Sequence, residues 1–314
     1  MNLVLVEHVD GAATDVSLQA LTLAAGLGGE THVLVIGPGG AAAAASVPAA
    51  VVHVAEHDAL DAFAPDAWAS VLCGLAEQIG ATAVVAPGTG RATDAMARAA
   101  VRLGEPLAAN CISVTQGDPL LLMRVRWGGS LLEEARLHAG RALLTVAPHA
   151  VAPVAAGAPG SVETFTPEIA DADLVVRVRD RVAPPAGGVS LADAKVVVTG
   201  GRGVGSAEGF VVVEELAGLL GGAVGCSRAV TMSGWRPHTD QVGQTGNKIA
   251  PEIYIACGVS GATQHIAGAK GAKKILAVNT DPEAPIMSIA DYAVVGDLHE
   301  VLPAVSAELR RRRG

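Results

Sequence analysis

Residues 195–220 read KVVVTGGRGVGSAEGFVVVEELAGLL, and this stretch decides the fold of the second half of the chain. The run Lys195–Thr199, rich in valine, predicts a buried strand, and a glycine-rich turn follows it at Gly200–Gly205. Helical spacing of apolar residues then predicts a helix over Ser206–Leu220, with Ser206 as its N-cap. A strand, a tight turn and a helix in this order predict a parallel sheet covered by helices.

The same alternation continues from this stretch to the C-terminus. Short apolar runs predict further strands, and a closing helix is expected at His299–Arg311. One predicted strand starts at Ala223–Val224, and the others are Ile253–Ala256, Ile275–Val278 and Ala293–Val295. This half of the chain is therefore predicted to be a doubly wound parallel sheet.

The first half also alternates strands and helices. The predicted elements are strands at Val4–Val6, His32–Ile36, Val51–Val54 and Ala83–Ala86, and helices at Asp15–Leu27, Asp66–Ile79 and Thr93–Leu103. Between Cys111 and Val146 the pattern changes to strand-like runs separated by turn residues. We therefore expect a mostly parallel α/β sheet with added antiparallel strands.

A linker divides the two halves. Residues 184–188 read PPAGG, and no hydrophobic periodicity crosses them. We expect an α/β protein of two domains, residues 1–185 and residues 189–314, since 314 residues suffice for two cores.

Composition excludes several classes of protein. Half of the residues are hydrophobic and the net charge is -9, which argues against binding to nucleic acid or to a membrane surface. No long uninterrupted apolar run predicts a membrane span. The four cysteines (Cys73, Cys111, Cys226 and Cys257) are scattered, so buried reduced thiols in a cytoplasmic protein are expected.

The glycine-rich turn is a candidate phosphate site, because backbone amides at the start of a helix attract anions. It departs from the dinucleotide fingerprint, since Ser206 stands where glycine or alanine is expected. No acidic residue follows about 20 residues later, where a ribose-binding carboxylate belongs. An ordinary nicotinamide domain is therefore disfavoured, whereas a phosphate site is not.

Polar residues follow the ends of the other predicted strands in this half. Ligands of parallel sheets bind beyond the carboxyl ends of strands, so we expect these residues to line one crevice. They are Ser227 and Arg228, Ser260–His265, Asn279–Pro282 and Gly296–Leu298, joined by the long loop that contains Gln241–Gly246.

In order and spacing, the stretch from Lys195 to Val301 resembles the C-terminal domain of electron transfer flavoprotein alpha subunits. The matching motifs are Gly201–Gly203, Ser227-Arg228, Gln241–Gly246, Ala250-Pro251, Tyr254–Ala256, Gly258–Ala262, Gln264-His265, Asp281–Ile286, Ala290–Tyr292 and Gly296–Leu298. The first half is similar more loosely, through Leu5–His8 and a helix start at Gly90-Arg91. It departs around residues 127–150, where Ala147-Pro148-His149 replaces the arginine that the family usually carries after a strand.

The resemblance implies that the second domain binds FAD. Arg202, Ser227, Ser260 and Gly261 would then face the pyrophosphate, and Thr245, Arg228 and His265 the isoalloxazine ring. Asn279, Asp297 and Leu298 would lie at the adenosine end. The full candidate set is Gly201, Arg202, Gly203, Ser227, Arg228, Gln241, Val242, Gly243, Gln244, Thr245, Ser260, Gly261, Ala262, Thr263, Gln264, His265, Asn279, Asp297 and Leu298. A cation beside the ring, from Arg228 or a protonated His265, would favour the reduced flavin.

The function implied is that of an electron carrier without substrate chemistry of its own. As a heterodimer with a beta subunit, it would pass electrons singly from donor dehydrogenases to an acceptor. No nucleophile–base pair is visible in the sequence, which suits a carrier. The alternatives are a nicotinamide-binding oxidoreductase domain and a non-redox assembly protein that kept the fold.

Several other polar and aromatic residues are assigned no contact with the cofactor. His238 and Lys248, in the flavin-side loop, fit either contact or solvent, and the Gly88–Arg91 loop is expected to be structural or partner-facing. Trp127 and Trp235 are expected to be packing anchors.

Overall fold

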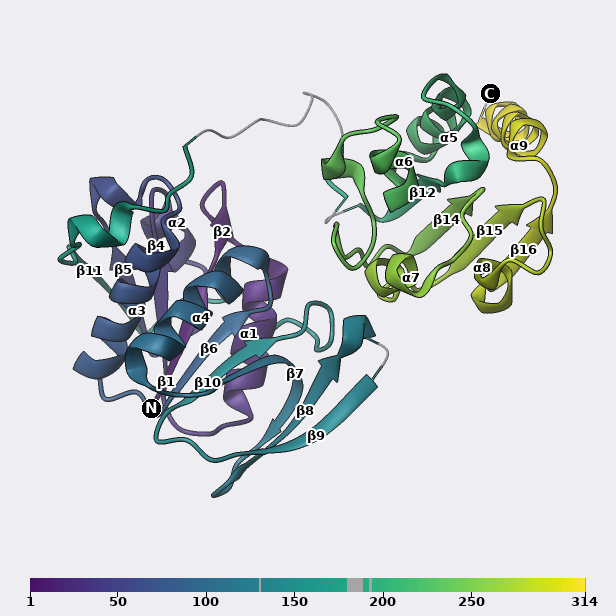
Figure 1. Cartoon of the computed structure of the whole chain (residues 1–314). Helices are drawn as coiled ribbons and strands as arrows, with labels where there is room; N and C mark the ends of the chain where they lie inside the picture. Colours follow the sequence, from purple (N-terminus) through teal and green to yellow (C-terminus); the bar gives the residue numbers. More distant parts are fainter. Residues whose placement is uncertain (130, 180–188, 192–193, 314) are drawn as a thin grey trace. The chain divides into compact units, whose positions relative to one another are not determined.

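A computed structural model describes residues 1–129, 131–179, 189–191 and 194–313. The chain divides into two compact units, residues 1–181 and residues 182–314 (Figure 1). The linker predicted at residues 184–188 lies outside the described residues. Each unit is described by itself below.

The described part of the first unit contains a nine-stranded sheet in the order β11-β5-β4-β1-β6-β10-β7-β8-β9. The strands are β1 (Asn2–Val6), β4 (Thr31–Ile36), β5 (Val51–Ala55), β6 (Ala83–Pro87), β7 (Leu107–Thr115), β8 (Leu120–Arg126), β9 (Leu131–Leu137), β10 (Ala142–Val146) and β11 (Ser161–Phe165). Only the pairs β7–β8 and β8–β9 are antiparallel. The predicted mostly parallel sheet with antiparallel strands is therefore confirmed. A small hairpin, β2 (His8–Val9) and β3 (Ala12–Ala13), follows β1.

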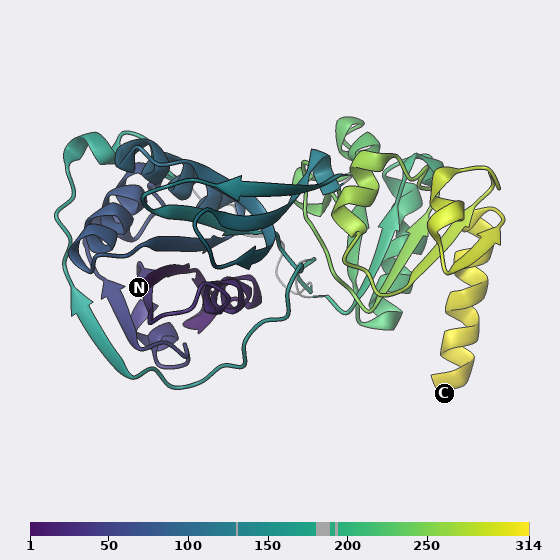
Figure 2. The same cartoon turned by 90° about the horizontal axis from the view of Figure 1, so that it is seen from below.

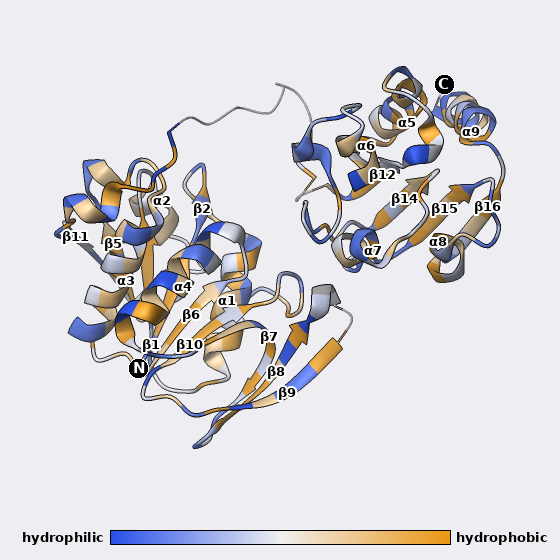
Figure 3. Ribbon diagram, viewed as in Figure 1, coloured by the Kyte–Doolittle hydropathy of each residue, from blue (hydrophilic) through white to orange (hydrophobic). Residues whose placement is uncertain are grey.

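Two helical layers cover this sheet. Its helices are α1 (Asp15–Ala25), α2 (Gly40–Ala44), α3 (Pro65–Gln78) and α4 (Gly90–Leu103), with 3-10 turns η1 (Asp58–Leu60), η2 (Trp127–Gly129) and η3 (Asp171–Leu174). Successive strand residues point to opposite faces, so Leu3 and Leu5 pack under α3 and α4 while Val4 and Val6 pack under α1 and α2. The central strands are apolar along their length because both faces are covered (Figure 3).

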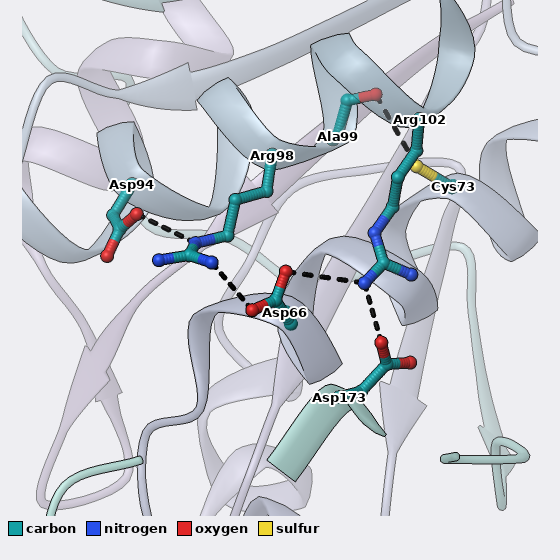
Figure 4. Close-up of polar contacts among 7 residues, drawn as sticks. All are labelled: Asp66, Cys73, Asp94, Arg98, Ala99, Arg102 and Asp173. Atoms are coloured by element: carbon teal, nitrogen blue, oxygen red, sulfur yellow. Dashed lines mark hydrogen bonds and ion pairs between the residues drawn. The ribbon is translucent and has the colours of Figure 1, made fainter. Parts of the chain in front are cut away.

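An ion-pair network holds η3 against the two outer helices (Figure 4). Arg102 of α4 contacts Asp173 of η3 at 2.6 Å and Asp66 of α3 at 3.3 Å. Arg98 lies 2.6 Å from the other oxygen of Asp66 and 3.0 Å from Asp94. Partly buried ion pairs thus hold the chain after β11 against the rest of the first unit.

The described part of the second unit contains a five-stranded, fully parallel sheet in the order β13-β12-β14-β15-β16. Its strands are β12 (Val196–Gly200), β13 (Ala223–Cys226), β14 (Ile253–Cys257), β15 (Ile275–Asn279) and β16 (Tyr292–Val295). Its helices are α5 (Val211–Leu220), α6 (Arg228–Met232), α7 (Thr263–Ala269), α8 (Pro285–Ile289) and α9 (Leu298–Arg313), with 3-10 turns η4 (Arg202–Val204), η5 (Glu208–Phe210) and η6 (His238–Asp240). α5, α6 and α9 contribute to the core on one face, and α7 and α8 to the core on the other. The predicted doubly wound sheet is confirmed, and the last turns of α9 project beyond it (Figure 2).

Two local expectations are wrong. The helix predicted from Ser206 begins only at Val211, because the chain first forms η5, where the hydroxyl of Ser206 accepts from the Gly209 amide at 3.2 Å. A Cβ on Gly209 would lie 2.3 Å from the Val204 carbonyl, so the chain passes η4 too closely to start a helix earlier. Trp127 is no packing anchor, since it is 81% exposed at the tip of the β8–β9 hairpin, whereas Trp235 does pack against a core.

The four cysteines are free and buried, as expected. Within the described residues, none of the helices has the length and apolar character needed to cross a membrane.

Candidate functional site

The five strands of the second sheet are parallel, so their carboxyl ends lie at the same edge of the sheet. The chain runs from β12 outward to β13 on one side and later to β14 on the other, so strand order reverses between β12 and β14. Ligands of doubly wound sheets bind at such a switch point. Backbone bonds link the successive tips: Ser227 N to Gly200 O at 3.0 Å, Gly201 N to Cys257 O at 2.8 Å, Gly258 N to Val278 O at 2.9 Å and Gly296 N to Asn279 O at 3.0 Å.

The glycine-rich turn is used to join β12 to β14. Gly201 and Gly203 donate their amides to the carbonyls of Cys257 and Gly258, at 2.8 and 3.0 Å. A Cβ on Gly201 would lie 2.2 Å from the Gly258 carbonyl oxygen, which is why glycine is needed there. These two amides are therefore not available to a phosphate, contrary to the expectation from the sequence.

The side chains beside this turn remain open. Arg202 is exposed, and its guanidinium group has neither a hydrogen bond nor an ion pair to any described residue. Ser227 is the N-cap of α6, yet its hydroxyl makes no capping bond, and its buried Oγ has no partner among the described residues. Buried polar atoms are nearly always bonded in folded proteins, so an orphaned hydroxyl here fits a bound ligand.

Arg228 follows Ser227 at the start of α6. Its guanidinium group is exposed and unpaired within the described ranges of the chain. Two unpaired guanidinium groups, Arg202 and Arg228, thus lie near the same switch point. Guanidinium binds phosphate oxygens in a forked geometry, so such groups suit a dianionic pyrophosphate or an electron-rich ring.

The loop that contains Gln241–Gly246 runs from η6 to β14, and its Val242 amide bonds to the carbonyl of Cys226 at the tip of β13, at 2.9 Å. Gln241 is 2% exposed, and its side chain accepts from the Thr231 hydroxyl at 2.7 Å and donates to Thr245 Oγ1 at 3.0 Å. The amide of Gln244 donates to the Gln264 carbonyl at 2.7 Å. The loop therefore holds Thr245 at the surface beside the start of α7.

His265 of α7 is buried, with 7% of its surface exposed. Its Nε2 lies 2.6 Å from the hydroxyl of Tyr254. Burial lowers the pKa of His265 to about 4, against a smaller opposing effect of the Val242 carbonyl. His265 is therefore neutral at pH 7, and the expectation that a protonated His265 could serve as the ring cation is wrong; sequence alone could not show its burial.

The remaining candidate residues differ in which of their groups are exposed and which are already bonded to the protein. Ser260 is exposed and Gly261 has a φ of 82°, where a Cβ would lie 2.3 Å from the Ile286 amide nitrogen. Asn279 is engaged with the protein, through the Val259 carbonyl at 2.9 Å and the Asp281 amide at 3.0 Å.

At the last strand tip, Asp297 accepts from the His299 amide at 2.8 Å, and Leu298 is buried. Leu298 can therefore offer a ligand chiefly its backbone, whereas Asp297 is exposed and its carbonyl already accepts from the Glu300 and Val301 amides. Ala262, Thr263 and Gln264 are exposed at the start of α7, and His238 and Lys248 are exposed as well.

A separate cavity of about 510 Å³ lies in the first unit, near the ends of β1 and β4. Arg91 lines it, stacks 4.9 Å from the Trp68 ring and 5.2 Å from the Phe63 ring, and lies 3.4 Å from the Glu7 carboxylate. Thr89 caps α4 by accepting from the Ala92 amide at 3.1 Å. Arg91 and Thr89 thus both make contacts within this unit.

Comparison with known proteins agrees with this geometry. The electron transfer flavoprotein FAD-binding domain matches residues 190–270, and the electron transfer flavoprotein domain matches residues 2–170. These matches define a flavoprotein whose second unit is a FAD-binding domain.

Relatives match over almost the whole chain. An electron transfer flavoprotein subunit alpha from Mycobacterium tuberculosis is 42% identical, with 99% of each chain covered. Those of Mycobacterium leprae and Bacillus subtilis are 41% and 34% identical, with 99% and 98% of this chain and 99% and 97% of theirs covered. The chain belongs to the electron transfer flavoprotein alpha subunit family. Neither the nicotinamide alternative nor the assembly-protein alternative is supported.

The residues present fit FAD. The orphaned Ser227 hydroxyl and the unpaired cations Arg202 and Arg228 match a ligand with a diphosphate. All three lie at the switch point, where such a dinucleotide binds in doubly wound sheets.

Proposed function

We propose that this chain binds FAD across the strand tips of its second unit and, with a beta subunit, carries electrons singly from dehydrogenases to an acceptor. The observation that carries the proposal is the pair of unpaired guanidinium groups, Arg202 and Arg228, around an orphaned buried hydroxyl at the switch point. The flavin supplies the redox chemistry when it is bound.

The protein's own residues bind and orient the cofactor. Arg202 and the Ser227 hydroxyl hold the pyrophosphate, with Ser260 and Gly261 beside it. Thr245, held by Gln241, presents a hydroxyl that can donate or accept at the ring. Asn279, Asp297 and Leu298 line the adenosine end, Leu298 through its backbone.

Arg228 sets the charge beside the ring. A unit charge ~4 Å away at an effective dielectric near 20 is worth about 4 kcal/mol. Half of that, about 2 kcal/mol, corresponds to roughly 90 mV for one electron. Such a shift separates two one-electron steps, which single-electron transfer requires.

The first unit offers a surface for the beta subunit. Leu122 of β8 is buried, so its neighbours on β8 and their cross-strand partners on β9 face away from the core. This hairpin outer face, defined as Leu121, Met123, Val125, Leu132, Glu134 and Arg136, carries four apolar side chains beside two charged ones. An antiparallel face exposed to water is normally more polar than this. Leu132 is 65% exposed. We assign this face to the partner subunit.

The buried free thiols support a reducing compartment, which we propose to be the cytoplasm.

The test is purification with and without a beta subunit. The complex should be yellow, with flavin absorbance near roughly 450 nm, and release FAD on denaturation. The chain alone should be poorly soluble or bind FAD weakly. A complex that shows only protein absorbance, or that binds NAD in place of FAD, would overturn the proposal. A monomeric yellow chain with full FAD affinity would overturn its heterodimer part.

A further inference from the structure

Beneath the proposed cofactor site, two buried polar side chains share one hydrogen bond. Tyr254, in the middle of the parallel sheet on β14, has no exposed surface, and its hydroxyl lies 2.6 Å from His265 Nε2. His265 is in the first turn of α7, the helix whose exposed start is next to loop 241–246. The pair therefore joins the core of the sheet to the edge of the site.

The number of protons in this pair is limited. A neutral imidazole carries one N–H donor and one lone-pair acceptor, and a phenol has a single O–H to donate. Burial lowers the pKa of His265 and raises that of Tyr254, so the pair holds one phenol proton and one imidazole proton at neutral pH. Only two arrangements of these protons are possible at the 2.6 Å contact.

In the first arrangement, the phenol donates to Nε2 and the imidazole proton is on Nδ1. That N–H then points toward the loop side, where the Val242 carbonyl raises the pKa of His265, as an acceptor does. Nδ1 itself is buried and has no partner of hydrogen-bond geometry among the described residues. It is therefore a donor with room for an acceptor.

In the second arrangement, Nε2–H donates to the phenol oxygen. The phenol proton would then need another buried acceptor, and the Thr199 hydroxyl lowers the pKa of Tyr254, as a donor to the phenol oxygen does and an acceptor does not. The lone pair of Nδ1 would also face the Val242 carbonyl, placing two acceptors together. The second arrangement thus leaves the phenol proton without an acceptor and sets a lone pair against a carbonyl, whereas the first leaves only an N–H donor that faces that carbonyl. The first arrangement is therefore favoured.

We infer that Tyr254 is a positioning residue that fixes His265 as the neutral Nδ1–H tautomer, so that His265 offers the FAD site an N–H donor in place of a positive charge. The inference rests on the proposed FAD site. The acceptor it fits is an oxygen of the bound cofactor, and the positive charge at the ring is then left to Arg228.

The first experiment reads the tautomer directly and needs no flavin. Nitrogen-15 NMR of histidine-labelled full-length chain, in complex with its beta subunit and stripped of FAD, is assigned by comparison with H265Q. The His265 signals should show a protonated Nδ1 and an unprotonated Nε2, without titration between pH 5 and 8. In Y254F they should shift toward a mixture of tautomers. A protonated Nε2 in the native chain, or a Y254F spectrum identical to it, would overturn the inference.

Tyr292 provides the matched control, because it is the only other tyrosine and is 59% exposed. Y292F should leave the His265 signals unchanged. If Y292F shifts them as much as Y254F does, the effect is not specific to the buried hydroxyl and the inference fails.

The second experiment measures FAD affinity and separates this inference from the proposed function. Y254F should weaken FAD binding about tenfold, or about 1.4 kcal/mol. Asparagine places its amide near Nδ1 and glutamine near Nε2, so H265N should retain more affinity than H265Q. Equal affinities for these two variants, with native affinity in Y254F, would contradict the positioning role. Absence of FAD binding by the native complex would instead overturn the proposed function, whatever the tautomer.

Discussion

Arg228 is the residue on which the proposed redox behaviour depends most. It is exposed, unpaired among the described residues and adjacent to the orphaned hydroxyl of Ser227. R228Q should lower the reduction potential of bound FAD by roughly 50–100 mV, because it removes a cation that favours the reduced ring. Spectroelectrochemical titration of the complex measures this shift.

Arg313, exposed at the end of α9, is the control for that measurement. R313Q makes the same charge change far along the helix from Leu298 and should leave the potential within a few millivolts. If the reduction potential falls equally in both variants, it depends on the net charge of the protein and not on the position of Arg228.

Gly201 tests the packing of the turn. A Cβ there would lie 2.2 Å from Gly258 O and 2.6 Å from Val259 Cα, so G201A must separate the tips of β12 and β14. We expect FAD affinity to fall at least tenfold, about 1.4 kcal/mol, with a lower melting temperature. In G218A the new Cβ meets nothing within 4 Å inside α5, and this variant should be stabilised by about 0.5–1 kcal/mol. Native FAD affinity in G201A would contradict the role of the turn.

At this scale, the sequence predicted candidate residues at the strand tips but not which of their polar groups are free. Arg202, Ser227 and Arg228 lie at linked strand tips, as the motif spacing indicated. The engaged amides of Gly201 and Gly203 were not predictable, because their acceptors lie at the end of β14 and directly after it, more than fifty residues away. The neutral state of His265 depends on burial by Tyr254, which no local pattern reveals.

At the scale of elements, the η3 network holds the chain that follows β11. Asp173 is 8% exposed, and Arg102 is the cation nearest to it. R102L should destabilise the first unit by about 1–3 kcal/mol, because it leaves a buried carboxylate without its partner. Hydrogen exchange of residues 171–178 should accelerate with it.

The exposed pair Arg311–Glu308 on α9 is the comparison. R311L should cost under about 1 kcal/mol, since exposed ion pairs contribute little. A loss in R102L no greater than in R311L would show that the network does not fasten η3.

A histidine pair links the three strands at the opposite edge of the first sheet. His32 Nδ1 lies 2.9 Å from His53 Nε2, with Glu30 at 2.8 Å from His32 and Glu163 of β11 at 3.4 Å from His53. Burial lowers the pKa of His53, with Glu163 opposing and His32 adding to the shift. The unfolded chain, whose histidines titrate near pH 6.5, therefore binds more protons than the folded chain just below that pH.

Stability should therefore fall as the pH drops from 7.5 to 5.5, and H53Q should lessen that fall. Urea unfolding at both pH values measures it. H138Q, at an exposed histidine after β9, should behave like the native chain. An H53Q variant with the native pH dependence would remove His53 from this account.

Element prediction succeeded where a periodic pattern was long. The helix at α3 and the strands β1, β4, β6 and β14 were found within a few residues of their observed bounds. α6 and α8, with five residues each, are too short for a 3.6-residue period to show. β11 was missed because its residues are exposed and polar enough to read as a loop, yet it pairs with β5 throughout.

At the scale of the molecule, the hairpin outer face tests the assembly. L132S should weaken association with the beta subunit at least tenfold, because it removes an exposed apolar side chain from the proposed interface. Val101, 84% exposed on α4, is the matched control, and V101S should assemble normally. Analytical ultracentrifugation of each variant mixed with the beta subunit measures this association. Normal assembly of L132S would place the partner elsewhere.

The division into two α/β halves was predictable because each half repeats its own alternation of strands and helices. The order of the strands in the first sheet was harder to predict from the sequence. β10 inserts between β6 and β7, although three strands precede it in sequence after β6. Such a crossover depends on which tips can pair, and adjacent residues do not encode it.

The linked strand tips have a consequence for the rate of the proposed electron transfer. Amides that already bond to neighbouring tips, as at Gly201 and Gly203, cannot swing to follow a change of charge on a cofactor. A stiff dipolar frame rearranges little when an electron arrives or leaves, so the nuclear motion that limits such a jump stays small. A stiff backbone around the proposed flavin site would thus make electron transfer faster.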